Sequence, residues 1–283
     1  MINTGDLEKI LATTFATGWI KNEQPLSLLI IAKVGFGKSA LVARFALNDG
    51  IFYTNDSTVY SLHKLHGEDL KTGKIKHIVI PDLLNALNKQ KEQAGAFITF
   101  MNSLIEEGIS RVESRDSHFS INYPVRVGLV TCIAAQDYIK RRDQWSAVGF
   151  LSRLLPIRFR YSKSTIEAIL DSIVLRQYHG DRPTRLNFSK FMEIDLPVKI
   201  GNDIKQIAKV TKDPEDELAG RRLKQLQVFS MGLAMLAGRD QVNRDDLIEL
   251  ARLSPFMRPP QYINVTRGKV QVVLENTDSY KEI

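Results

Sequence analysis

The sequence predicts an α/β protein in which a three-layer domain with a parallel sheet is followed by a smaller helical domain. Over the first 160 or so residues, short apolar runs alternate with helical patterns, as they do in domains built from parallel strands. From about Ser162 onward the strand pattern fades and the convincing patterns are helical. This change predicts a sheet domain over residues 1–160, a helical domain over 161–256 and a C-terminal tail over 257–283.

The expected elements follow in chain order. An amphipathic segment opens the chain, with apolar residues at helical spacing from Leu7 to Phe15. The apolar runs that we expect to form strands are residues 26–32, 51–53, 77–80 and 125–134. Helical spacing predicts helices over 39–47, 83–104, 164–176, 219–236 and 244–253. We expect a break near Gly95 and a lone strand over 269–274, and the pattern of the polar segment 185–217 is ambiguous.

Composition narrows the classes of partner and location. A net charge of +7 and a pI of about 9.4 favour a partner that carries phosphates, such as nucleic acid, although the same excess also promotes solubility. The single cysteine, Cys132, lies in an apolar run, which excludes an intrachain disulfide and predicts a buried, unreactive thiol. Apolar stretches are far shorter than the roughly 20 residues of a membrane span, and the first residues lack a signal-peptide layout. We therefore expect a cytoplasmic protein without a membrane partner.

The most informative motif is Gly35-Phe36-Gly37-Lys38-Ser39, between an expected strand and an expected helix. A phosphate cradle needs glycines that turn backbone N–H groups inward, a lysine for the phosphate charge and a hydroxyl for Mg²⁺. The alternative is a plain glycine turn between strand and helix. The residues predicted to bind the phosphates of ATP are Ala32, Lys33, Val34, Gly35, Phe36, Gly37, Lys38 and Ser39. Ala32 stands where glycine is usual, which is tolerable if its φ is negative.

An acidic residue, Asp82, directly follows the apolar run 77–80. In that position it is predicted to hold Mg²⁺ together with Ser39. Asp is also a preferred helix N-cap, so Asp82 can instead cap a helix that starts at Leu83, and the two roles can coexist. In most hydrolysing proteins with this phosphate-site pattern, a glutamate directly follows the aspartate and polarises the attacking water, whereas here Leu83 follows. Glu106 and Glu107 are other carboxylates that could supply a base, although their spacing does not require it.

Several segments together resemble the AAA+ ATPases. Residues 32–39 resemble the phosphate loop of that family, and residues 149–159 resemble its arginine-finger segment, which implies that Arg153 is the finger. Residues 221–247 are similar to the lid helices of minichromosome-maintenance helicases and MoxR-type ATPases, which implies that Arg221 is the second sensor. The resemblance covers about residues 25–255 and implies a P-loop AAA+ domain with a helical lid. It also implies bound ATP and Mg²⁺, and a homo-oligomer in which Arg153 acts in trans.

Two further segments, residues 105–111 and 127–137, resemble the pre-sensor-1 hairpin and sensor-1 strand of the same two groups. The resemblance implies that Asp137 is the sensor, with Gln136 and Thr131 as alternatives. Related motors grip DNA with this hairpin, and the alternative is a solvated charged loop. The basic residues in or near the hairpin are Arg111, Arg115, His118 and Arg126. Arg153 could likewise be only a surface charge, and one of Arg221 and Arg222 could be solvated.

The function predicted from these residues is an ATPase that assembles into a ring or filament. It would act on DNA, as replication or mobile-element proteins do, or remodel a protein. Because Leu83 cannot polarise water, the alternative is a nucleotide-binding switch or assembly module with weak or absent hydrolysis. A DNA-binding protein without nucleotide is disfavoured by the complete set of Gly35, Gly37, Lys38 and Ser39.

Overall fold

A five-stranded parallel sheet forms the centre of the protein, which confirms the predicted α/β class. The computed structural model describes residues 4–55, 58–88, 91–114, 117–177, 182–213, 216, 218–259, 262–265 and 272–275. The strand order is β2-β3-β6-β1-β7, so β6 lies between the strand before the glycine motif and the strand before Asp82. The strands of this sheet are β1 (Leu28–Ala32), β2 (Ile51–Tyr53), β3 (His77–Ile80), β6 (Gly128–Ala134) and β7 (Leu155–Arg158).

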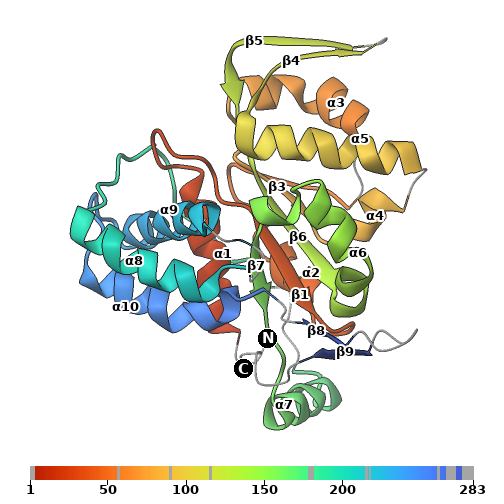
Figure 1. The fold of residues 1–283 in the computed structure, drawn as a ribbon, viewed down its shortest axis with the longest axis vertical. Helices are drawn as coiled ribbons and strands as arrows, with labels where there is room; N and C mark the ends of the chain where they lie inside the picture. The colour runs from red at the N-terminus through yellow and green to blue at the C-terminus, as the bar shows by residue number, and fades with distance from the viewer. Residues whose placement is uncertain are drawn as a thin grey trace.

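Helices cover both faces of the sheet, because alternate residues of each strand enter different hydrophobic clusters (Figure 1). Leu28 and Ile30 enter one cluster, whereas Leu29 and Ile31 enter the other. The helices that pack on the Leu29 face are α3 (Val59–Lys71), α4 (Leu83–Leu87), α5 (Lys91–Asn102), the π-helix η1 (Ser103–Glu107) and α6 (Ala135–Ala147). The helices on the Leu28 face are α1 (Gly5–Thr17), α2 (Lys38–Ala43), α8 (Val198–Thr211), α9 (Gly220–Leu236) and α10 (Arg244–Leu253).

The first helix, α1, packs against α9 although more than 200 residues separate them in the chain. A Cβ atom on Gly232 would lie 2.7 Å from the carbonyl oxygen of Thr13, so the two helices approach closely where α9 has no side chain. The helical layer therefore contains an element from each end of the sequence. By contrast, α7 (Lys163–Val174) lies apart from α8, α9 and α10 in Figure 1, and Ile173 and Val174 are exposed.

An antiparallel hairpin of β4 (Ile109–Ser114) and β5 (Ser117–Val125) extends beyond α3 at the top of Figure 1. The hydroxyl of Tyr123 on β5 donates to the carbonyl of Lys71 over 3.2 Å, which ties the hairpin to α3. Arg111 and His118 belong to the two strands of the hairpin, and Arg115 falls outside the described residues.

Several predicted boundaries are wrong. The helical pattern 83–104 breaks after Leu87, and Gly95 lies inside α5, where an exposed glycine costs only about 1 kcal/mol. The run 125–134 is not one strand, because Val125 ends β5 and β6 starts at Gly128. The expected lone strand is paired: β9 (Val272–Glu275) runs antiparallel to β8 (Tyr262–Val265).

Several elements were not predicted, among them α3, α6, β7, α8 and β8. Strand β7 contains Pro156 and ends on Arg158, and a proline is tolerated there because β7 is an edge strand. Helix α8 lies in the segment described above as ambiguous, although Ile200, Ile204 and Ala208 have helical spacing. Among the described residues, no helix combines the length and apolar character needed to cross a membrane.

Candidate functional site

The loop between β1 and α2 is a tight turn that depends on its glycines. Gly35 has a φ of 82° and Gly37 has a φ of 69°, and both values lie in the left-handed region that glycine adopts without strain. Ala32 is the last residue of β1 and is not among the described residues with positive φ. The condition under which alanine can replace glycine at that position is therefore met.

This loop forms one wall of a cavity at the carboxyl ends of three adjacent strands, β1, β6 and β3. The cavity has a volume of about 450 Å³. Its lining joins the loop to the end of β3, the end of β6 and the start of α6. The charged and hydroxyl side chains in that lining are Lys38, Ser39, Asp82 and Asp137. The structure therefore brings together residues that are up to about 100 positions apart in the sequence.

Ser39 joins the loop directly to the strand that precedes Asp82. Its hydroxyl donates to the carbonyl of Pro81 over 3.1 Å. Asp82 is also the N-cap of α4, where its carboxylate accepts from the backbone N–H of Leu84 over 3.0 Å. The predicted capping role is thus confirmed, and the same side chain lines the cavity. One carboxylate oxygen, Oδ1, makes the cap bond, so the other oxygen is available to a ligand.

The lysine of the loop is held by backbone oxygens. Lys38 Nζ donates to the carbonyl of Ala32 over 3.0 Å and to that of Lys33 over 2.8 Å. Burial lowers the pKa of Lys38, and the nearby Asp82 acts in the opposite direction. Cys132, which also lines the cavity, is buried as predicted, and burial raises its pKa to about 12. A neutral thiol and a partly desolvated ammonium therefore face the same space.

The three candidates for the sensor lie in different places. Asp137, in the first turn of α6, lines the cavity, and its carboxylate lies 3.9 Å from the ammonium of Lys140. Gln136 is exposed and is not part of the lining. Thr131 is buried inside β6, and its hydroxyl donates to the carbonyl of Ile80 over 2.8 Å, which links β6 to β3. Of the three, the structure brings Asp137 to the loop.

An aromatic contact supports the loop from the side of β7. Phe36 stacks on Tyr161 with ring centroids 5.0 Å apart, and the hydroxyl of Tyr161 donates to the carbonyl of Phe36 over 3.2 Å. Sequence analysis did not single out Tyr161. The two residues are 125 positions apart, so no local signal connects them.

The residue after Asp82 points away from the cavity. Leu83 is fully buried in the cluster on the Leu29 face of the sheet. A glutamate at this position would place a carboxylate in an apolar core, where an unpaired charge is strongly disfavoured. Glu106 and Glu107 do not line the cavity either. The carboxylates of its described lining are Asp82 and Asp137.

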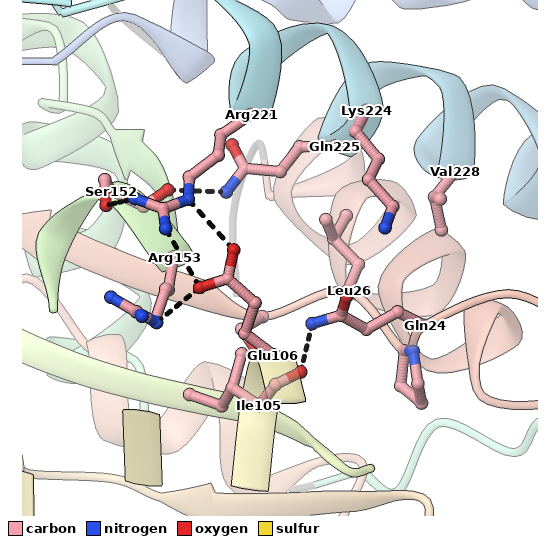
Figure 2. A pocket seen from close by; sticks show the side chains of 12 residues that line it. Gln24, Leu26, Ile105, Glu106, Ser152, Arg153, Arg221, Lys224, Gln225 and Val228 are labelled. Atoms are coloured by element: carbon pink, nitrogen blue, oxygen red, sulfur yellow. Dashed lines mark hydrogen bonds and ion pairs between the residues drawn. The ribbon is translucent and has the colours of Figure 1, made fainter. Parts of the chain in front are cut away.

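The two arginines implied by the family resemblance lie at the opposite edge of the sheet. Arg153 precedes β7 and therefore lies at the amino ends of the parallel strands, whereas the glycine loop follows the carboxyl end of β1. Arg221 opens α9 and lies beside Arg153 in a small pocket of about 60 Å³ (Figure 2). Neither arginine lines the cavity beside the glycine loop.

The arginine next in sequence to Arg221 has a different environment. Arg222 is buried and donates to the side-chain oxygen of Gln225 over 3.1 Å. Burial lowers its pKa to about 10, and Asp213 and Asp216 partly oppose this effect. Arg221 is half exposed, with 47% of its side-chain surface accessible. Arg221 is therefore the member of the pair that can meet an external ligand.

The donors at the cavity suit a hard cation rather than zinc. A hydroxyl from Ser39 and a carboxylate from Asp82 are oxygen ligands of the kind that Mg²⁺ takes together with phosphates and water. Across the part of the chain that the structure describes, no three His, Cys, Asp or Glu side chains are grouped as a metal site would need. The oxygen donors of this cavity suit Mg²⁺ better than zinc.

No protein-family model and no curated protein matches this chain.

Proposed function

We propose that this protein binds ATP with Mg²⁺ on the loop from Ala32 to Ser39 and works as an ATPase of the AAA+ type. The observation that carries the proposal is the bond from Ser39 to the carbonyl of Pro81. It brings the hydroxyl of the glycine loop next to Asp82, which follows a different strand, and both side chains line one cavity. A cation ligand and a phosphate cradle thus meet where a triphosphate needs both.

Each residue has a role that follows from its chemistry. The left-handed glycines, Gly35 and Gly37, let the backbone approach phosphate oxygens closely. Lys38 exchanges its two carbonyl partners for the β- and γ-phosphates, which are stronger partners for an ammonium. Ser39 and Asp82 would hold Mg²⁺, which would neutralise charge on the phosphates. Asp137 faces the same space and is placed to sense or orient the terminal phosphate group.

The position of the arginines supports assembly. An arginine stabilises the charge that develops on a transferred phosphoryl group, but Arg153 and Arg221 lie at the sheet edge away from their own loop. They can serve a nucleotide only if a second copy of the chain presents it, as in a ring or filament. The net charge of +7 and the projecting hairpin favour DNA as the substrate of that assembly, with a remodelled protein as the other class.

A second candidate function is a nucleotide-dependent switch or assembly module with little hydrolysis. The observation in its favour is the burial of Leu83, because the usual water-polarising position is occupied by a core residue. Asp82 is engaged as a helix cap, which leaves Asp137 as the other carboxylate in the described lining. Slow turnover with intact binding would support the switch, and brisk Mg²⁺-dependent turnover would support the ATPase.

The test is a nucleotide titration of Lys38→Ala beside Lys33→Ala. Both variants remove one lysine from the same loop, but Lys33 is exposed, whereas Lys38 points across the loop to the carbonyls of residues 32 and 33. We expect Lys38→Ala to lower ATP affinity by roughly 100-fold, the value of about two charge-assisted hydrogen bonds, and Lys33→Ala to change it little. Unchanged affinity in folded Lys38→Ala would refute the phosphate-loop assignment.

A further inference from the structure

One carboxylate, that of Glu106, holds both arginines at the amino edge of the sheet. Its Oε2 lies 2.7 Å from Arg153 Nε, and its two oxygens lie 3.0 and 3.1 Å from Nε and Nη2 of Arg221 (Figure 2). The three side chains come from η1, from the turn before β7 and from α9. Glu106 therefore contacts both arginines, and under the proposed function these arginines contact the nucleotide of a neighbouring copy.

The contact uses the edge of the guanidinium that a phosphate would need. Arg221 donates from Nε and Nη2 to the carboxylate of Glu106. Its Nη1 donates to the hydroxyl of Ser152 over 2.7 Å. Arg153 donates from Nη1 to the carbonyl of Gly149, also over 2.7 Å. Paired N–H groups on one edge are what let arginine bind carboxylate or phosphate oxygens in a fork. While Glu106 remains in place, phosphate oxygens cannot take that edge of Arg221.

Glu106 is also anchored at the base of the hairpin. Arg126, which follows β5, donates to the backbone carbonyl of Glu106 over 2.9 Å and to that of Glu107 over 3.2 Å. The side chain of Gln24 donates to the carbonyl of Ile105 (Figure 2). The main chain of η1 is thus fixed on both sides, and the carboxylate alone is directed at the arginines.

We propose that Glu106 is an internal competitor that pairs with Arg153 and occupies the phosphate-accepting edge of Arg221 until a nucleotide on a second copy displaces it. This inference rests on the proposed function, because the displacing anion is the terminal phosphate of ATP held by another chain. It adds a residue outside the phosphate loop that sets how readily copies associate. It also places the competing carboxylate next to the base of the hairpin, so that movement of the hairpin base would move this carboxylate.

The exposure of the cluster suits exchange rather than permanent pairing. The accessible fractions of the side chains are 13% for Arg153, 31% for Glu106 and 47% for Arg221. An ion pair between groups as exposed as Glu106 and Arg221 contributes little net stability, because water solvates the separated charges well, whereas Arg153 is more buried. A triphosphate with bound Mg²⁺ offers more charge and more acceptor oxygens than one carboxylate, so the exchange is favourable once a second copy supplies it.

The test compares self-association of wild type, Glu106→Gln and Glu107→Gln by sedimentation velocity with Mg²⁺ and a non-hydrolysable ATP analogue. Glu107 is exposed and adjacent, so Glu107→Gln makes the same charge change next to the cluster. We expect Glu106→Gln to associate at a protein concentration about two- to fivefold lower than wild type, and Glu107→Gln to match wild type. Without nucleotide, none of the three should associate more strongly than the others.

The inference would be overturned if Glu106→Gln did not associate at a lower protein concentration than wild type. If Glu106 only orients the arginines, Glu106→Gln should associate at the same or a higher concentration than wild type. Binding of the analogue to dilute protein is measured in parallel. Failure of wild type to bind it would refute the proposed function, whereas normal binding without tighter association of Glu106→Gln would refute the competitor alone.

Discussion

The two edges of the parallel sheet are built in different ways. At the carboxyl edge, the glycine loop is one contiguous segment whose shape comes from Gly35 and Gly37 and whose partners are mainly backbone carbonyls. At the amino edge, the arginine cluster consists of side chains from three distant segments, joined by Glu106. The first edge is preorganised by local sequence, whereas the second exists only when the helical layer and the sheet are correctly packed.

The distance between the two edges determines which chain can contribute residues to a shared site. Strand β1 has five residues and therefore spans about 16 Å between them. An arginine side chain cannot cover that distance, so under the proposed function the two edges of one chain belong to two different composite sites. Each copy would offer its carboxyl edge to a nucleotide and its amino edge to the nucleotide of a neighbour.

The largest expected effect comes from disabling the amino edge in one chain and the carboxyl edge in another. Under the proposed function, Arg153→Ala alone should lower ATP turnover by roughly 10³-fold, the lower end of the range for an arginine that acts in trans. Lys38→Ala alone should also be inactive. A mixture of the two should regain part of the activity, because an intact loop on one chain meets an intact Arg153 on the other. Turnover of the mixture against each variant alone is the measurement.

Arg153→Lys is the matched control for that experiment. It keeps the charge but not the planar fork, so it should remain impaired if the fork contacts the nucleotide. Full turnover by assembled Arg153→Ala would place the finger elsewhere and remove the functional difference between the two edges.

The same comparison explains what the sequence could predict. The carboxyl edge was predictable because Gly35, Gly37, Lys38 and Ser39 are adjacent, and their spacing reflects the geometry of one loop. Asp82 was found for a similar reason, since it directly follows an apolar strand. The five-stranded sheet was predicted in class, but β7 was missed because Pro156 and Arg158 hide the strand pattern.

The amino edge was predictable only in part. Arg153 and Arg221 were identified by resemblance to a family, and nothing in the sequence indicated that they share Glu106, which is 115 positions from Arg221. Pairing across that distance depends on how the helical layer packs on the sheet. Tyr161 was missed for the same reason, because its contact with Phe36 exists only in the folded chain.

A buried histidine makes the amino edge of the sheet sensitive to acid. His77 starts β3, is fully buried, and its Nε2 lies 3.2 Å from the carbonyl of Leu26. Burial lowers its pKa to about 3, and the bond to Leu26 opposes the shift only partly. As pH falls, the unfolded chain therefore takes up a proton on His77 at a higher pH than the folded chain does. The free energy of unfolding should fall as pH decreases from about 6.5 toward 3, by up to about 1.4 kcal/mol per pH unit.

Denaturant unfolding of wild type and His77→Leu at several pH values tests this. The difference between the two free energies should shrink or change sign as pH falls below about 6.5, because leucine cannot take up the proton. His66→Gln, on α3, is the control and should follow wild type. Parallel curves for wild type and His77→Leu would show that another group carries the acid sensitivity.

The smallest expected effect separates the two roles of Asp82 at the carboxyl edge. Asparagine caps a helix about as well as aspartate, so Asp82→Asn should unfold within about 0.5 kcal/mol of wild type, whereas Asp82→Ala should lose about 1 kcal/mol with the bond to Leu84. Both variants lack the carboxylate, so the factor by which Mg²⁺ raises ATP affinity should be about tenfold smaller in both than in wild type. Thermal unfolding and ATP titration with and without Mg²⁺ measure the two effects separately. If Asp82→Asn keeps its full Mg²⁺-dependent affinity, Asp82 is only a helix cap, and the cation at this edge must be held by Ser39 and other residues.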